Sequence, residues 1–185
     1  MVRPMIEDAT SLLAPELIKA GGGPLIRVTL GPDGIPVAAV AGMRVNATPA
    51  RAWQVLADVD AYPGRVPMVN RVKRAGDRVT VQLKFRISLF SVGFEFTAET
   101  IAVENRSLEL RHVAGEPREL RLRFDVLPDG DGSLVYAAIG FDVMSLGWLA
   151  KYFLRHHPEI QYGIFPGASL ALLDSMRRVA EPAAT

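Results

Sequence analysis

The sequence predicts an α+β domain in which a curved antiparallel sheet is closed by helices around an apolar interior. Three observations lead to this fold class. Residues 45–69 hold the caps and prolines of two short helices, a long run of apolar and polar residues then alternates with a period of two, and a helical period begins near Ser145. Because the strands come in one run and do not alternate with helices, α+β is favoured over a parallel α/β arrangement.

The composition is that of one ordinary globular domain. The chain has 185 residues, of which 49% are hydrophobic and 22% charged, and this length suits a single core of sizeable volume. The net charge of +1 argues against a dedicated nucleic-acid-binding protein, which needs a surplus of Lys and Arg. The chain has no cysteine, so disulfides, thiolate nucleophiles and Cys-ligated metals are excluded.

The sequence also favours a cytoplasmic location. Residues 1–16 contain acids and prolines where a signal peptide would need an unbroken apolar run. No stretch approaches the roughly 18 consecutive apolar residues of a membrane-spanning helix.

Residues 1–24 are predicted to be an extension that precedes the main domain. A short helix is expected over residues 8–20, and Gly21, Gly22 and Gly23 end it and act as a flexible joint. Two strands, at residues 25–30 and 35–45, flank a Gly-Pro-Asp-Gly turn and should form a hairpin.

Two short helices are predicted next. Thr48 can cap the first helix, Pro49 suits its first position, and apolar residues follow at helical spacing as far as Val59. Asp58 can cap a second helix, and Pro63 keeps it short.

The following residues predict a meander of half-buried strands joined by Gly, Asp and Asn turns. The expected strands are residues 69–75, 79–88, 92–103, 108–113, 120–126 and 134–143. The last of them is apolar on both faces, so it should be central or covered on both sides.

Helices are predicted to complete the domain, which we place at residues 25–180. Ser145 can cap a helix that ends at Pro158, and a longer helix then runs to about Val179, interrupted by Pro166 and Gly167. Small residues on its inner face would leave room beneath it. Residues 181–185 are expected to be a tail.

The segment A-T-P-A-R-A-W-Q-V-L-A-D-V-D-A-Y-P-G-R-V-P, with hairpins and a long helix after it, resembles the START-like (SRPBCC) superfamily. Within it, the chain is similar to the polyketide cyclase/dehydrase and coenzyme Q-binding branch over about residues 36–180. The matching positions are Pro49, Trp53, Leu56, Asp58, Tyr62, Pro63 and Pro67. The resemblance implies a helix-grip fold, in which the sheet wraps around the C-terminal helix and encloses a hydrophobic cavity. Members bind lipids, quinones, sterols or polyketides, and a minority catalyse ring closure and dehydration.

In such a fold the core-facing side chains of the sheet also line the cavity. Ligand pockets are mainly apolar, so we expect ligand contacts from the large apolar residues of the strands and from the inner face of the last helix. The candidates are Phe85, Ile87, Phe94, Phe96, Phe124, Ile139, Phe141, Ile164, Ala168 and Leu172.

Aromatase or cyclase chemistry would require polar groups within this cavity, able to polarise a carbonyl or to move a proton from carbon. Tyr136, Asp142 and Arg123 are the candidates for such roles. Weaker ones are Arg86, Tyr162 and Glu95. For the arginines a solvated strand face is the better interpretation.

No metal and no cofactor is predicted. His156 and His157 are adjacent, and neighbouring residues on a helix point about 100° apart, so they do not readily share one ion. The sequence has no G-x-S-x-G motif, and its Gly-Gly-Gly-Pro segment lacks the Lys and Ser/Thr of a phosphate-binding loop.

Two surfaces suggest transient partners. The apolar turn at residues 89–92 could guard an entrance or touch a membrane. A basic face on one hairpin could approach anionic lipid or an acidic carrier protein. Its residues are Arg71, Lys73, Arg74, Arg78, Lys84 and Arg86.

Three functions are consistent with these observations. The first is a protein that binds or transfers a hydrophobic small molecule and is not an enzyme. The second is an aromatase/cyclase that acts on a polyketide, and the third is an accessory interaction protein with a vestigial cavity. The sequence does not indicate the oligomeric state.

Overall fold

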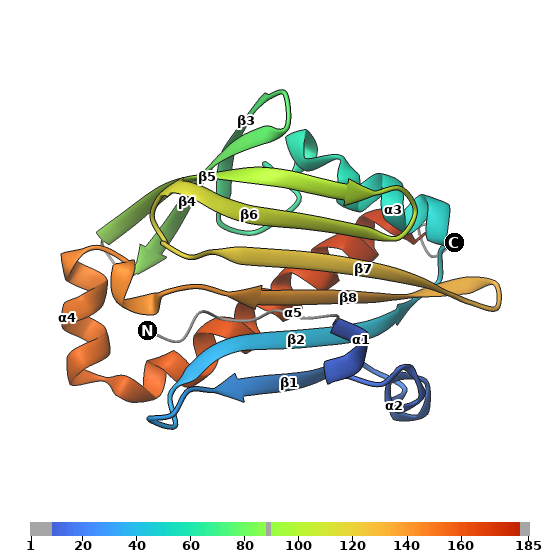
Figure 1. Ribbon diagram of the computed structural model, residues 1–185, viewed down its shortest axis with the longest axis horizontal. Helices are drawn as coiled ribbons and strands as arrows, with labels where there is room; N and C mark the ends of the chain where they lie inside the picture. The colour runs from blue at the N-terminus through green and yellow to red at the C-terminus, as the bar shows by residue number, and fades with distance from the viewer. Residues whose placement is uncertain (1–8, 88–89, 182–185) are drawn as a thin grey trace.

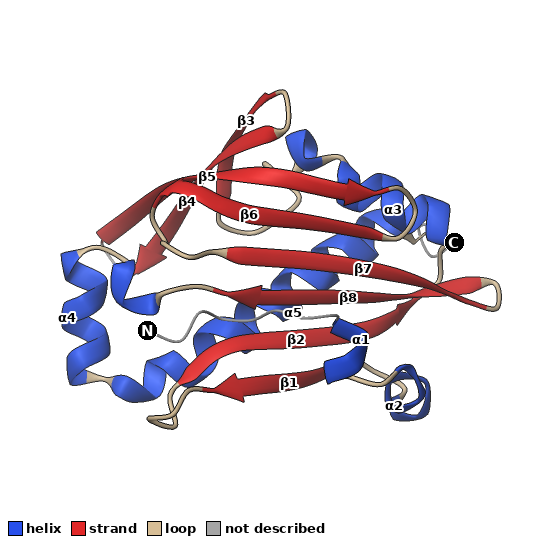
Figure 2. Cartoon of the chain, viewed as in Figure 1, coloured by secondary structure: helices blue, strands red, loops and turns tan. Residues whose placement is uncertain are grey.

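The computed structural model, which describes residues 9–87 and 90–181, is an eight-stranded antiparallel sheet curved around one long helix (Figures 1 and 2). The strands are β1 (Leu25–Leu30), β2 (Pro36–Val45), β3 (Val69–Ala75), β4 (Arg78–Ile87), β5 (Phe90–Val103), β6 (Ser107–Gly115), β7 (Arg121–Asp129) and β8 (Gly132–Gly140). Their order in the sheet is β1-β2-β8-β7-β6-β5-β4-β3. The sequence therefore predicted the fold class and the strands, with small differences at the strand ends.

β8 is an interior strand of the sheet and is buried along its whole length, so it is covered on both sides, as its two apolar faces predicted. It pairs with β2 on one side and with β7 on the other. Its odd-numbered residues Val135, Ala137 and Ile139 belong to the main core on the concave face. Because successive residues of a strand face opposite sides, Tyr136 lies on the convex face.

The N-terminal segment covers the part of the convex face formed by β2 and β8. Here the prediction of one helix over residues 8–20 is wrong, since two short helices form, α1 (Ala9–Leu12) and α2 (Pro15–Gly21). Pro15 is the reason, because a residue before proline is disfavoured in the helical region and Ala14 is extended here, with φ −60° and ψ 136°. The two helices bury apolar side chains against the convex face. That outer cluster comprises Ala9, Leu13, Ile18, Val40, Leu134, Tyr136 and Ala138.

The segment between β2 and β3 forms the two short helices that the sequence predicted, α3 (Pro49–Ala57) and η1 (Val59–Ala61). The Thr48 Oγ1 atom accepts a hydrogen bond from the Arg51 backbone N–H at 3.3 Å, so Thr48 caps α3 as expected. Asp58 precedes η1 but makes no capping hydrogen bond there; its carboxylate accepts one from Arg65 instead, at 3.1 Å.

The C-terminal part contains η2 (Val143–Ser145), α4 (Trp148–His156), η3 (Pro158–Ile160) and α5 (Gln161–Ala180). Ser145 does not cap α4. Its hydroxyl accepts a hydrogen bond from the Arg118 N–H at 2.7 Å and donates one to the Asp142 carbonyl, which ties the end of η2 to the loop before β7.

α5 is continuous through Pro166, so the predicted interruption there is wrong. A proline in a helix removes one hydrogen bond, and its φ is compatible with helical backbone. The helix lies along the concave face and buries Phe165, Leu172, Leu173 and Met176, and this burial stabilises it beyond its local propensity. Within the described residues, no helix combines the length and the apolar character needed to cross a membrane.

Candidate ligand-binding cavity

A cavity of about 780 Å³ lies between the concave face of the sheet and α5. The sheet contributes side chains from β3 to β8, and α5 contributes small residues, which leave space under the helix. Three further segments complete the wall: the loop after η1, the loop before β7, and the region from η2 to η3. The cavity therefore lies where the small residues of α5 leave a gap between the helix and the sheet.

Seven of the ten predicted ligand contacts line this cavity. They are Phe94, Phe96, Ile139, Phe141, Ile164, Ala168 and Leu172. Phe141 also packs on Phe165 of α5, with ring centroids 4.9 Å apart. Whether these residues touch a ligand stays a prediction, but the structure brings them to one apolar surface.

The other three predicted contacts do not appear on the described wall. Phe124 lies on the concave face of β7 but is fully buried in the core, on the side where α3 packs against β7. The side chains of Phe85 and Ile87 lie outside the described part of the structure, as do residues 88–89 and the side chains of residues 90–92, so the apolar turn predicted at residues 89–92 is not described either.

Several lining residues were not predicted. Strand residues such as Val81, Leu110 and Leu122 share the concave face with the predicted ones, so strict alternation could have added them. Gly167 and Ala171 of α5 line the cavity as well. The other unpredicted residues come from loops and short helices, whose positions no local pattern gives: Tyr62, Val66, Pro67, Met68, Pro117, Leu120, Leu146, Leu154, His157 and Ile160.

Only two lining side chains in the described part of the chain carry a polar ring or hydroxyl group, Tyr62 and His157. The Tyr62 hydroxyl donates a hydrogen bond to the Leu56 carbonyl at 2.7 Å. Burial, and then the nearby carboxylate of Asp58, raise the pKa of Tyr62 above its ordinary value, so the phenol stays protonated. His157 is exposed, and its Nδ1 atom lies 3.1 Å from Glu159 Oε1.

We expect Tyr62→Phe to lower the free energy of unfolding by about 1 kcal/mol near neutral pH, because a buried hydrogen bond is lost. The pKa of Tyr62 is raised in the folded state. Its contribution to stability is therefore complete below about pH 10, where the unfolded phenol titrates, and is lost as the pH rises further. Urea unfolding over a pH series should show a shallower alkaline decline for the variant. Tyr152→Phe, at an exposed site, is the control, and an equal decline in all three proteins would contradict the prediction.

The three catalytic candidates do not lie on the cavity wall. Tyr136 and Arg123 are on the convex face, where Arg123 forms a bidentate ion pair with Asp125 at 2.7–3.1 Å. Asp142 follows β8 and accepts a hydrogen bond from the Met144 N–H at 2.9 Å, which caps η2. β8 is apolar on both faces, so the sequence pattern could not tell which face Tyr136 occupies.

The weaker catalytic candidates do not converge either. The Tyr162 hydroxyl donates a hydrogen bond to the Gly34 carbonyl at 3.0 Å and is half exposed. Glu95 is an exposed residue of β5, one position from the lining residues Phe94 and Phe96 and therefore on the other face. The side chain of Arg86 lies outside the described part.

The mouth of the cavity is marked by residues that both line it and reach solvent. Met68, after η1, and Ile160, in η3, are such residues. Pro67, His157 and Gly167 share this property. The opening therefore lies where the loop after η1 faces the start of α5.

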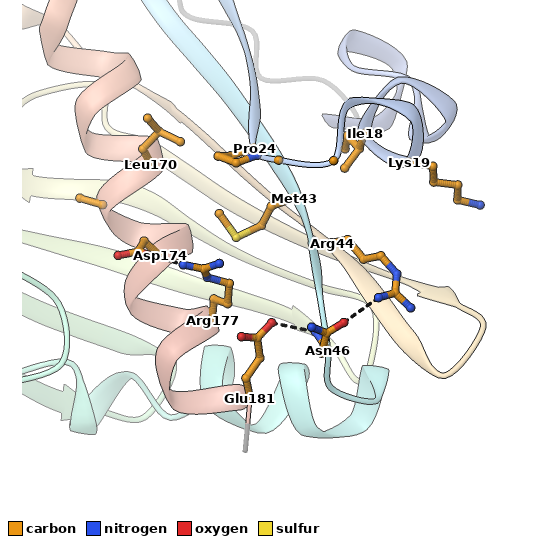
Figure 3. A pocket seen from close by; sticks show the side chains of 13 residues that line it. Ile18, Lys19, Pro24, Met43, Arg44, Asn46, Leu170, Asp174, Arg177 and Glu181 are labelled. Carbon is orange, nitrogen blue, oxygen red and sulfur yellow. Dashed lines mark hydrogen bonds and ion pairs between the residues drawn. The ribbon is translucent and has the colours of Figure 1, made fainter. Parts of the chain in front are cut away.

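A second hollow, of about 650 Å³, lies between α2, β2 and the end of α5 (Figure 3). Its charged side chains are engaged by neighbouring carboxylates, cations or backbone groups. Asp129 binds Lys19 at 3.1 Å and Arg44 at 2.9 Å, and these hydrogen bonds lower the pKa of Asp129. Glu181 accepts a hydrogen bond from the Asn46 N–H at 2.9 Å. This hollow is a polar junction between the N-terminal helices and α5.

His156 and His157 do not share a partner. The His156 Nδ1 atom donates to the Tyr152 carbonyl at 2.8 Å, whereas His157 pairs with Glu159. In the described residues, no three His, Asp or Glu side chains are grouped as metal ligands would be.

The family model of "Polyketide cyclase / dehydrase and lipid transport" matches residues 45–157, which is more than half of the chain. The protein therefore belongs to this family of START-like proteins. A search of curated protein sequences found no match.

Solved structures with the same fold include an aromatase/cyclase, a START superfamily protein and a lipid transfer protein. The Zhui aromatase/cyclase of a Streptomyces species is 14% identical and has a TM-score of 0.59; the alignment covers 84% of this chain and 94% of that one. A START superfamily protein from Mycobacterium smegmatis is 16% identical with a TM-score of 0.58, covering 77% and 97%. A STAR-related lipid transfer protein from Xanthomonas axonopodis is 15% identical with a TM-score of 0.50, covering 84% and 98%. At these identities the likeness shows the helix-grip fold. Family and fold together support a protein that binds a hydrophobic ligand or resembles a polyketide cyclase.

Proposed function

We propose that the protein binds or transfers a hydrophobic small molecule, such as a lipid, a quinone or a polyketide-like compound, in the cavity beneath α5. The observation that carries this proposal is the apolar wall around a volume of about 780 Å³. Sites for small molecules usually have about 300–1,000 Å³ and few polar groups. We place this function in the cytoplasm and in the domain formed by residues 25–180.

Two features favour binding over the alternatives. Acyl or carbonyl chemistry needs convergent polar groups at the reacting atoms, and the described wall offers the occupied hydroxyl of Tyr62 and the exposed ring of His157. A vestigial cavity would be small, whereas this one can take a ligand of substantial size. Burial of apolar ligand surface would drive binding at roughly 25 cal/mol per Å², less the cost of ordering the ligand.

Native mass spectrometry of the purified protein, followed by solvent extraction, tests the proposal directly. We expect an apolar compound to co-purify, or the emptied protein to take up N-phenyl-1-naphthylamine with an increase in fluorescence. No extracted compound, together with no uptake of the probe, would contradict the proposal. Conversion of a polyketide by the purified protein would favour the cyclase alternative.

Filling the cavity should prevent uptake of the probe. Ala168 of α5 lines the cavity, so Ala168→Phe places a ring in the ligand volume, and we expect binding of N-phenyl-1-naphthylamine to weaken by about tenfold or more. The measurement is a fluorescence titration. Ala50→Phe, on the exposed side of α3, is the matched control and should bind as the wild type does. Equal affinities for all three proteins would show that the probe binds elsewhere.

A further inference from the structure

The outer face of α4 combines exposed aromatic rings with cations. Trp148 is 79% exposed, the largest fraction of any large apolar side chain in the described structure, and Tyr152 is 54% exposed. The cation Lys151 lies between these two rings in the sequence, and Arg155 follows Tyr152 by three residues. Positions i, i+3, i+4 and i+7 share one face of a helix, so these four residues form a single stripe, here called the α4 stripe.

Another side of α4 faces the cavity. Leu154 is buried and lines the cavity, as do Leu146 before the helix and Ile160 after it. Figure 1 shows α4 at one end of the molecule, beyond the ends of the central strands, with its axis across the end of the sheet. α4 therefore separates the apolar cavity from the α4 stripe.

The charges carried by residues 148–160 have one dominant sign, although Glu116, which follows β6, also reaches the start of α4, where its Oε2 atom accepts a hydrogen bond from the Gly147 N–H at 3.3 Å. Residues 148–160 contain Lys151, Arg155 and two histidines, and their only acid is Glu159. Glu159 is engaged with His157, and the His156 ring stacks against Tyr152 with centroids 4.3 Å apart. A surface with exposed Trp and Tyr next to Lys and Arg complements the interface of a bilayer that carries anionic lipids.

We propose that the α4 stripe docks on the surface of an anionic lipid bilayer. The nine residues of α4 are too short to span it, so the helix would lie in the headgroup region with Trp148 inserted. Because the same helix forms a wall of the cavity, docking would bring that wall against the source or destination of an apolar ligand. The inference rests on the proposed function for its purpose, but docking can be measured without a ligand.

The two tryptophans make the test direct. Trp53 is 8% exposed in the core and Trp148 is 79% exposed, so a blue shift on addition of vesicles reports the environment of Trp148. We expect a blue shift and co-sedimentation with phosphatidylcholine vesicles that contain phosphatidylglycerol, and much weaker binding to pure phosphatidylcholine. Trp148→Ala should weaken co-sedimentation by about tenfold. Lys151→Gln with Arg155→Gln should weaken it by roughly 25-fold, about fivefold for each cation.

The matched control is the other basic surface of the molecule. Lys73→Gln with Arg78→Gln removes two exposed cations from the β3–β4 hairpin and should leave vesicle binding unchanged. The proposal is wrong if the wild-type protein does not bind anionic vesicles. It is also wrong if the hairpin variant loses vesicle binding while the α4 variants keep it. It is also wrong if sedimentation shows a dimer that Trp148→Ala converts to a monomer, because the stripe is then a self-association surface.

The α4 variants should still take up N-phenyl-1-naphthylamine in solution. If vesicle binding fails and probe uptake persists, only the docking proposal is lost. If vesicle binding persists without probe uptake, the proposed ligand-binding function is lost and docking stands.

Discussion

Phe124→Ala is expected to lower the free energy of unfolding by about 3–5 kcal/mol, which is the usual cost of truncating a fully buried phenylalanine. Phe124 lies on the concave face of β7 and is completely enclosed by the core. Urea denaturation gives the measurement. We expect little direct effect on the ligand, because Phe124 does not line the cavity.

Phe94→Ala is the matched comparison, because Phe94 is half-buried and lines the cavity. Its truncation enlarges a space that already exists, so the loss of stability should be smaller, about 1–2 kcal/mol. Binding of N-phenyl-1-naphthylamine should change in this variant. Equal losses of stability at both positions would indicate that the cavity is filled by protein atoms in solution.

Ile18→Ala is expected to cost about 2–4 kcal/mol, although Ile18 lies in the N-terminal segment before the first strand. Its side chain is 2% exposed and sits over Gly42 of β2. A side chain at position 42 would occupy the space that Ile18 fills, so this glycine allows α2 to pack closely on β2. Thermal and urea unfolding both measure the effect.

Leu17→Ala is a closely matched control, since Leu17 is the preceding residue of the same helix and is 56% exposed. Its truncation should change stability by no more than about 0.5 kcal/mol. If both variants were as stable as the wild type, α1 and α2 would not be docked on the sheet in solution. The result therefore decides whether residues 9–21 stabilise the fold.

Most of the fold could be predicted because alternating apolar residues and turn residues identify strands from the local sequence. Alternation in β4 and the Gly-Asp turn before it place the hairpin, and Thr48 with Pro49 places the start of α3. Pro166 misled the prediction of α5, because the loss of one hydrogen bond is outweighed by burial against the sheet, which no local pattern reports.

The candidate site was predictable only in part. Rings such as Phe94 and Phe96 alternate with polar neighbours, which identifies the face they occupy. Tyr136 lies between apolar residues of β8, so alternation does not show which face of the sheet it occupies. It packs on the convex face, under the N-terminal helices. Loop residues such as Met68 reach the wall only because the chain after η1 folds over the cavity. This placement depends on tertiary packing, which local sequence patterns do not report.

The pairing of β2 with β8 sets the order in which this protein can assemble during synthesis. Ala41 in β2 pairs with Ala137 in β8, whereas β3 to β8 follow one another as hairpin-connected neighbours. A ribosome releases the neighbouring strands in turn, so the meander can form early, while β2 must wait with an unpaired apolar edge until β8 emerges. α5 is synthesised later still. A nascent chain of this protein therefore keeps one edge of β2 unpaired until β8, the strand that is buried along its whole length, has been synthesised.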